Sequence, residues 1–241
     1  MTLYSLGFRL LGGTLLALAM VGCDWHLPGK PIKPVEPKIG SRAHFERVYF
    51  VHCLGCHGPE GRNGPARPLS DPMYLASIPN ATFEKVVEEG HGVLMPGFKK
   101  TPFSGLTPEE ISAFTTSIKT YWGDPKKAGS DLPPYAQPAG SGNVKTGKST
   151  FATYCGACHG DDGAGKEGGA GSVVNNFYLE LVSDQALRST VIFGRTDLGC
   201  PTYRGPYPGM PEGKGLSPSD IDDVTAWLVS NRVSISEEAK Q

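Results

Sequence analysis

Apolar residues recur at every third or fourth position near the end of each half of the chain, and this spacing predicts two closing helices. In the first half, Ile111, Phe114 and Ile118 share one face of a helix that ends by Trp122. Residues 107–110 open this helix with a threonine cap, a proline at the first helical position and an acid at the third.

The second half repeats this plan. Residues 217–220 (Ser-Pro-Ser-Asp) open its last helix. The inner face of that helix carries Ile221, Val224, Trp227 and Leu228. Each half also contains a shorter predicted helix that a glycine ends: 81–89 before Gly90, and 184–193 before Gly194.

These patterns predict an all-α protein with two tandem domains. We expect the first domain over residues 39–122 and the second over residues 143–235. Residues 123–142, which are rich in proline and glycine, are expected to form a linker.

The N-terminus has a different character. Residues 1–22 contain an apolar stretch that is short for a membrane span, and small residues precede Cys23. This arrangement resembles a bacterial lipoprotein signal peptide, with lipidation at Cys23; an uncleaved anchor and an ordinary signal cut elsewhere are the alternatives. Residues 23–38 have a proline at every third position from Pro28 to Pro37, which predicts a polyproline II tether, with plain disorder as the alternative.

Composition limits the function classes. The 241 residues carry 23 Lys and Arg against 24 Asp and Glu, a net charge of −1, and nothing in this balance favours a nucleic-acid partner. Only 39% of residues are hydrophobic, while 32 are glycine and 21 are proline. Domains of this size therefore have thin cores, and a buried prosthetic group would supply apolar bulk.

Two short motifs bring in the chemistry: Cys53-Leu54-Gly55-Cys56-His57 and Cys155-Gly156-Ala157-Cys158-His159. C-x-x-C-H is the signature of c-type haem attachment, in which the thiols bond to the porphyrin and the histidine binds iron. A zinc ribbon requires its two cysteine pairs about 15–20 residues apart, whereas these are roughly a hundred apart. A thioredoxin-type dithiol requires a preceding strand, but the preceding segments read as short helices.

With these motifs the chain resembles class I cytochromes c, present as two tandem domains over roughly residues 40–122 and 143–232. The resemblance implies two covalently bound haem c groups. It assigns the thioether bonds to Cys53, Cys56, Cys155 and Cys158, and the proximal iron ligands to His57 and His159.

The distal iron ligand differs between the halves. Leu94-Met95-Pro96 resembles the distal loop of the family, so Met95 is expected at the first iron, with His91 as its competitor. In the second half Cys200 falls near the equivalent position, while Met210 precedes another proline. The number of residues between the candidate ligand and the last helix differs by five from the number in the first half, for Cys200 as well as for Met210. We predict Met210, with Cys200 as the alternative and a site that neither residue fills as a third possibility.

The resemblance implies one-electron transfer between respiratory or photosynthetic redox partners at the periplasmic face of a bacterial membrane. Such partners are a quinol-oxidising complex, a terminal oxidase or a dehydrogenase. The alternative is a dihaem enzyme similar to thiosulfate dehydrogenases, which would oxidise a small sulfur compound at a Cys-ligated haem. Cys200 is the feature that favours this enzyme.

Overall fold

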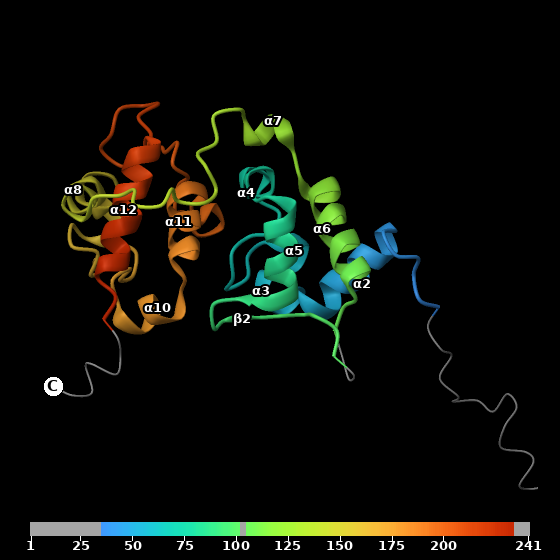
Figure 1. Cartoon of the computed structure of the whole chain (residues 1–241). Helices are drawn as coiled ribbons and strands as arrows, with labels where there is room; N and C mark the ends of the chain where they lie inside the picture. Colours follow the sequence, from blue (N-terminus) through green and yellow to red (C-terminus); the bar gives the residue numbers. More distant parts are fainter. Residues whose placement is uncertain (1–34, 102–104, 234–241) are drawn as a thin grey trace, which may run out of the picture. The chain divides into compact units, whose positions relative to one another are not determined.

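The structure, a computed structural model, describes residues 35–101 and 105–233. The predicted signal peptide and residues 23–34 of the predicted tether lie outside these ranges. Residues from Pro37 onward form one compact unit. In the described part, short strands β1 (Gly90–His91) and β2 (Met95–Pro96) pair with each other, and the remaining regular structure is helical, which confirms the predicted all-α class (Figure 1).

The first domain is built on α2, α5 and α6. Phe45 of α2 stacks on Phe114 of α6 with ring centroids 5.7 Å apart, and the edge of Trp122 meets Phe45 at 5.1 Å. Phe83 of α5 is buried in the same core. The helices of this domain are α2 (Arg42–His52), α3 (Leu54–His57), the 3-10 turn η1 (Pro59–Gly61), α4 (Pro72–Ser77), α5 (Asn80–Glu89) and α6 (Pro108–Trp122).

The second domain is built on α8, α11 and α12. Gly147 lets α8 and α12 approach closely, because a Cβ atom there would lie 1.9 Å from the Asp223 carbonyl oxygen. Phe151 and Trp227 then meet with ring centroids 4.4 Å apart. The helices from the linker onward are α7 (Pro125–Ala128), α8 (Val144–Tyr154), α9 (Gly156–His159), α10 (Asn176–Leu181), α11 (Asp184–Phe193), η2 (Thr196–Leu198) and α12 (Pro218–Ser230).

The helices α6, α11 and α12 begin where the sequence predicts, and α5, α6 and α11 also end there. Capping boxes open α6, through Thr107 and Glu110, and α12, through Ser217 and Asp220. Ser183 caps α11 by accepting from the backbone N–H of Ala186. The short helices α4, α7 and α10 were not predicted, because six or fewer residues carry too little periodicity to distinguish a helix from a loop.

The predicted linker is held against the second domain. Arg188 of α11, whose side chain is 1% exposed, pairs with Asp222 of α12 at 2.5 Å. The same guanidinium donates to the carbonyl oxygens of Pro134 and Tyr135, at 3.0 and 3.2 Å. These bonds satisfy a buried cation with linker backbone as well as with a carboxylate.

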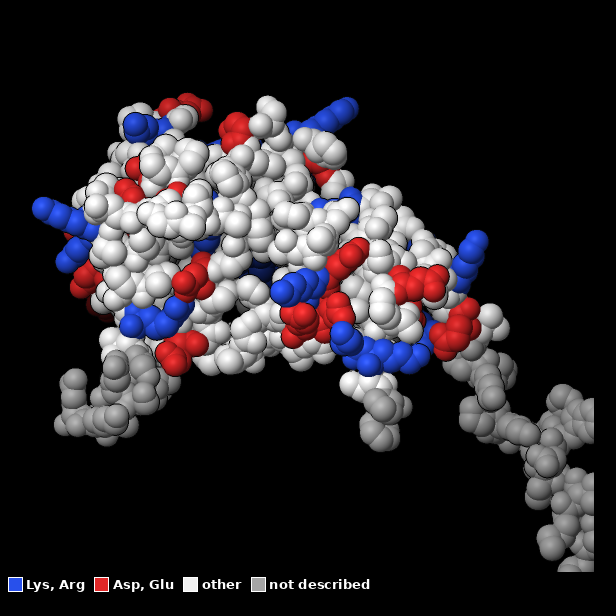
Figure 2. Space-filling model, in the orientation of Figure 1, with Lys and Arg blue, Asp and Glu red and all other residues white. Residues whose placement is uncertain are grey.

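One hydrophobic cluster extends across both domains, beside a second cluster around Phe151 and Trp227 in the second domain. Tyr74 of α4 meets Phe193 of α11 edge-on, with ring centroids 5.6 Å apart, and one cluster of buried residues extends from Phe45 to Ile221. Basic and acidic side chains are interspersed over the face in Figure 2, as the balanced net charge leads us to expect. In the described part of the chain, none of the helices has both the length and the apolar character that crossing a bilayer requires.

Candidate functional site

The first Cys-x-x-Cys-His motif forms a single helical turn. The backbone N–H groups of Cys56 and His57 both donate to the carbonyl oxygen of Cys53, at 3.2 and 2.9 Å. Residues three positions apart in such a turn are neighbours on one helix face. The two thiols therefore lie on the same side of α3, with the histidine following directly.

The second motif has the same backbone geometry. The N–H groups of Cys158 and His159 donate to the carbonyl oxygen of Cys155, at 3.1 and 3.0 Å. In both domains the turn follows a longer helix, α2 or α8, whose buried aromatic residues fix it to the core. The sequence repeat is thus a structural repeat.

Both motif histidines are oriented through Nδ1. His57 Nδ1 lies 2.7 Å from the Arg67 carbonyl oxygen, and His159 Nδ1 lies 3.1 Å from the Gly171 carbonyl oxygen. A carbonyl accepts, so Nδ1 carries the proton and Nε2 keeps the lone pair that binds a metal. Burial also lowers the pKa of His57, which favours the neutral ring needed for ligation.

The cysteines suit thioether bonds. All five cysteines in the described ranges are free of disulfides. Burial raises the pKa of Cys53 and of Cys155 to about 12, so both sulfurs are held uncharged. A thioether is uncharged as well, and it adds no buried charge when it replaces the thiol. The residues present therefore fit a covalently attached porphyrin.

Met95 lies on a two-stranded pair that follows α5. Gly90 is paired with Pro96, and His91 with Met95. Gly90 has φ +88°, and a Cβ atom there would lie 2.4 Å from the Met95 carbonyl oxygen. A glycine is required because the returning strand approaches this closely.

Cys200 has the same backbone surroundings in the second domain. Arg195 is bridged to Cys200 by two backbone hydrogen bonds, at 3.1 and 3.0 Å. Gly194 has φ +66°, and a Cβ atom there would lie 2.5 Å from the Cys200 carbonyl oxygen and 2.3 Å from that of Pro201. Gly194 thus corresponds to Gly90, and Cys200 corresponds to Met95.

The five-residue discrepancy in the sequence comparison falls after Cys200. Leu106 donates to the Phe98 carbonyl oxygen at 2.7 Å, and Leu216 donates to that of Tyr203 at 2.7 Å, so these two pairs are equivalent. The connection from Tyr203 to Leu216 is five residues longer than that from Phe98 to Leu106. Met210 lies in this longer connection, whose five extra residues have no counterpart in the first domain.

Two family models match the chain over the parts that carry these motifs. A model described as cytochrome C oxidase, cbb3-type, subunit III matches residues 41–116, and a cytochrome c model matches residues 144–232. The chain is a tandem dihaem cytochrome c. Two such domains imply two covalently bound haem c groups and a role in electron transfer.

The cytochrome is similar to proteins of two kinds. It is 30% identical over 191 residues to a thiosulfate dehydrogenase from Stutzerimonas stutzeri, covering 75% of this chain and 57% of that protein. It is 29% identical over 146 residues to the cbb3-type cytochrome c oxidase subunit FixPc of Rhizobium leguminosarum bv. viciae, covering 58% and 47%. It is 26% identical over 216 residues to the FixP subunit of Azorhizobium caulinodans, covering 84% and 65%. The chain thus spans about half to two thirds of the length of these curated relatives.

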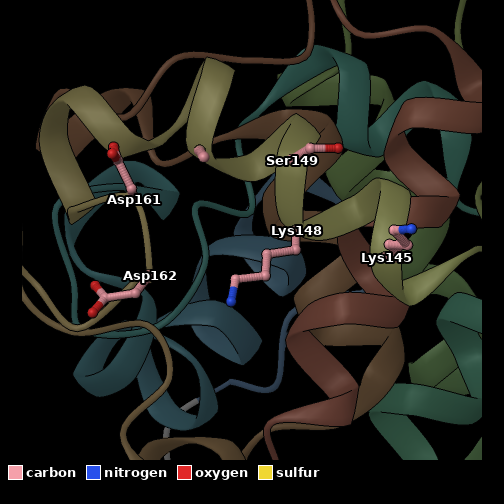
Figure 3. A pocket seen from close by; sticks show the side chains of 6 residues that line it. Lys145, Lys148, Ser149, Asp161 and Asp162 are labelled. Carbon is pink, nitrogen blue, oxygen red and sulfur yellow. The ribbon is translucent and has the colours of Figure 1, made fainter.

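A shallow depression of about 380 Å³ lies beside the second motif of the cytochrome (Figure 3). Lys145 and Lys148 of α8 line it, together with Asp161 and Asp162 of the loop after His159. Two positive and two negative side chains balance there, so the depression has no net charge with which to select a ligand. Among the described residues, no group of three or more acidic, histidine or cysteine side chains is placed to hold a metal ion.

Sequence reasoning missed the carbonyl groups that orient the histidines and the arginines that join the domains. Arg67 and Gly171 act on His57 and His159 through backbone oxygen, which every residue type possesses. Arg195 donates to the Gly64 carbonyl oxygen of the first domain at 2.9 Å. No local pattern identifies such partners, because each contact joins residues at least 10 positions apart in the sequence.

Proposed function

We propose that this cytochrome carries single electrons between redox partners at the periplasmic face of a bacterial membrane, tethered by a lipid on Cys23. The two haem motifs on one compact unit support a short relay. The apolar stretch and the small residues before Cys23 support export and lipidation. The relatives named as cbb3-type oxidase subunits favour a terminal oxidase as one partner, with a quinol-oxidising complex or a dehydrogenase as the others.

We assign the thioether bonds to Cys53 and Cys56 in the first domain and to Cys155 and Cys158 in the second. The proposed iron ligands are His57 with Met95, and His159 with Cys200. Haem iron supplies one-electron chemistry when bound. The chain's own contribution is to orient both imidazoles through Nδ1. It also places one sulfur atom, of Met95 or of Cys200, on the strand segment that returns after α5 or α11.

Cys200 replaces Met210 in this assignment, and one observation carries the choice. Cys200 shares with Met95 the strand pairing, the preceding glycine and the following proline. Met210 belongs to the longer connection and packs against the shared core. Burial raises the pKa of the free Cys200 thiol, so the thiol keeps its proton while it is free. It would lose that proton on binding iron, as thiol ligands do.

The two ligand sets would separate the two reduction potentials. A thioether is a weak donor that raises the potential of a haem, whereas a thiolate pushes electron density onto iron. The Cys200 site should therefore have the lower potential, and the Met95 site the higher one. An electron entering the chain would settle on the Met95 side.

Low-temperature EPR with a redox titration tests this assignment. Cys200→Ala should abolish a thiolate-type signal of low potential and leave the His57–Met95 signal unchanged. Met210→Leu, a matched change of the other sulfur residue, should alter neither signal. Loss of the second signal in Met210→Leu, with Cys200→Ala unaffected, would restore Met210 as the ligand.

A second candidate function is oxidation of thiosulfate. The observation that favours it is Cys200 beside the second motif, together with similarity to a protein named thiosulfate dehydrogenase. Joining two thiosulfate ions through a new S–S bond forms tetrathionate and releases two electrons. The purified protein should then reduce ferricyanide, which accepts one electron per ion, with thiosulfate as donor. A pure carrier would exchange electrons with redox proteins and show no such turnover, and Cys200→Ala should abolish the activity of an enzyme.

A further inference from the structure

Arg67 contacts both domains with different parts of the same residue. Its carbonyl oxygen accepts from His57 Nδ1 at 2.7 Å, within the first domain. Its guanidinium crosses to α11 of the second domain, where Nη2 donates to Thr190 Oγ1 at 2.9 Å and Nη1 donates to the Gly194 carbonyl oxygen at 3.5 Å. The residue that orients one proximal histidine is therefore anchored in the other domain.

The anchor in the second domain lies where the Cys200 strand begins. Gly194 ends α11, and the next residue, Arg195, is bridged to Cys200. A displacement of the Gly194 carbonyl would move the start of that strand. Arg67 is thus one residue away from the backbone that positions the proposed distal ligand of the second iron.

A second arginine ties the same two segments in the opposite direction. Arg195 donates to the carbonyl oxygens of Gly64 and Pro65 at 2.9 and 3.2 Å, in the loop that also carries Arg67. Asp197 holds the Arg195 guanidinium through two bonds of 2.9 Å. The loop after the first motif and the strand before Cys200 are therefore braced by side chains from both domains.

The surroundings of the Arg67 guanidinium make its position stiff. It packs near the rings of Tyr74 and Phe193, with its central carbon 5.7 Å from each ring centroid. Burial lowers the pKa of Arg67, although the charge of Asp71 opposes this. Its hydrogen-bond acceptors in the described chain include a hydroxyl and a carbonyl, and losing either would leave a desolvated donor unpaired.

We propose that Arg67 is a positioning residue that couples the two iron sites, so that the reduction potential of each depends on the backbone that frames the other. This rests on the ligand sets proposed above. A shift of α11 displaces the Arg67 guanidinium. The displacement moves the Arg67 backbone, whose carbonyl oxygen accepts the hydrogen bond from His57. Partners of this kind tune the ligand they orient.

Thr190→Val in the intact haem-loaded protein tests the coupling from the far side. The change removes the hydroxyl that accepts from Arg67 and leaves the first domain untouched. We expect the reduction equilibrium constant of the first haem to change by about tenfold, which corresponds to about 59 mV for one electron. Thr190→Ser keeps the hydroxyl and should leave the potential unchanged. Spectroelectrochemical titration measures both variants.

The outcomes separate this proposal from the ligand assignment. A shift at the first haem in Thr190→Val but not in Thr190→Ser supports the coupling. A shift confined to the second haem, or no shift in a variant with full haem content, overturns it. Should Thr190→Val fail to fold, Arg67→Lys, which loses the fork of donors, replaces it with Arg62→Lys on the same loop as its control. The EPR spectrum of the unaltered protein tests the ligands independently of these shifts.

Discussion

At the scale of single residues, two glycines determine where Met95 and Cys200, the proposed distal ligands, lie. Gly90 and Gly194 end α5 and α11 with φ of +88° and +66°, in the region that other residues rarely adopt. Each also faces the carbonyl oxygen of the following strand at a distance that excludes a Cβ atom. Met95 and Cys200 therefore reach equivalent places because a glycine precedes each of them.

Gly194→Ala should destabilise the protein and displace Cys200. The positive φ costs about 1–3 kcal/mol, and the contact with the Cys200 carbonyl oxygen adds to it. We expect a lower thermal unfolding midpoint and an altered EPR signal of the second haem. Gly213→Ala is the matched control, since Gly213 has φ +74° but no heavy atom within 4 Å of its ideal Cβ position. Equal effects of the two changes would contradict the role of the close approach.

At the scale of elements, the closing helices are stabilised by their first turns. Glu110 Oε2 accepts from the backbone N–H of Thr107 at 2.8 Å and from its hydroxyl at 2.9 Å. These bonds stabilise the charged carboxylate and hold the pKa of Glu110 below its ordinary value of 4.5. The start of α6 is therefore sensitive to acid.

Glu110→Gln should reduce the acid sensitivity of the protein. A lowered folded-state pKa contributes stability above pH 4.5 that is lost as the pH falls through 4.5 toward the folded value. At pH 7 the variant should be less stable by roughly 1 kcal/mol, the usual size of a cap interaction, and the difference should shrink below pH 4.5. Glu109→Gln removes the same charge outside the capping box and is the matched control in thermal unfolding measured against pH. An equal loss of stability at pH 7 in both variants would contradict the role of the capping box.

At the scale of the whole molecule, the two haem motifs belong to one packed unit. Tyr74 and Phe193 join the hydrophobic cores, and Arg67 and Arg195 join the loops that frame the two sites. The domains repeat each other in sequence, and side chains of both domains pack and form hydrogen bonds at the contact between them. We therefore expect the two potentials to respond together to changes at this contact.

Membrane attachment through a lipid on Cys23 is a proposed property of the whole molecule. Cys23→Ser should move the cytochrome from the membrane fraction to the soluble fraction, since it removes the residue proposed to carry the lipid. Labelling with a radioactive fatty acid should be lost in parallel. Asp24→Asn, at the neighbouring position, should keep both the label and the membrane location. A Cys23→Ser protein that remains in the membrane would support an uncleaved N-terminal anchor instead.

The sequence by itself determined the helices that carry the fold and the two motifs. The starts of α6, α11 and α12 followed from apolar periodicity and caps, and the end of α11 followed from a glycine stop, all of which act over one or two turns of chain. The spacing within Cys-x-x-Cys-His is local as well. Such features depend on neighbours in the chain, so they can be read without knowing the tertiary fold.

Only the tertiary structure decided between Cys200 and Met210 as the counterpart of Met95. A count of residues cannot locate an insertion, whereas the hydrogen bonds of Tyr203 and Leu216 show where the extra five residues lie. The sequence likewise did not predict the acceptor for His57 or the hydrogen bond from Arg67 to Thr190. Their physical reason is the same: each depends on which backbone atoms meet after distant segments have packed together.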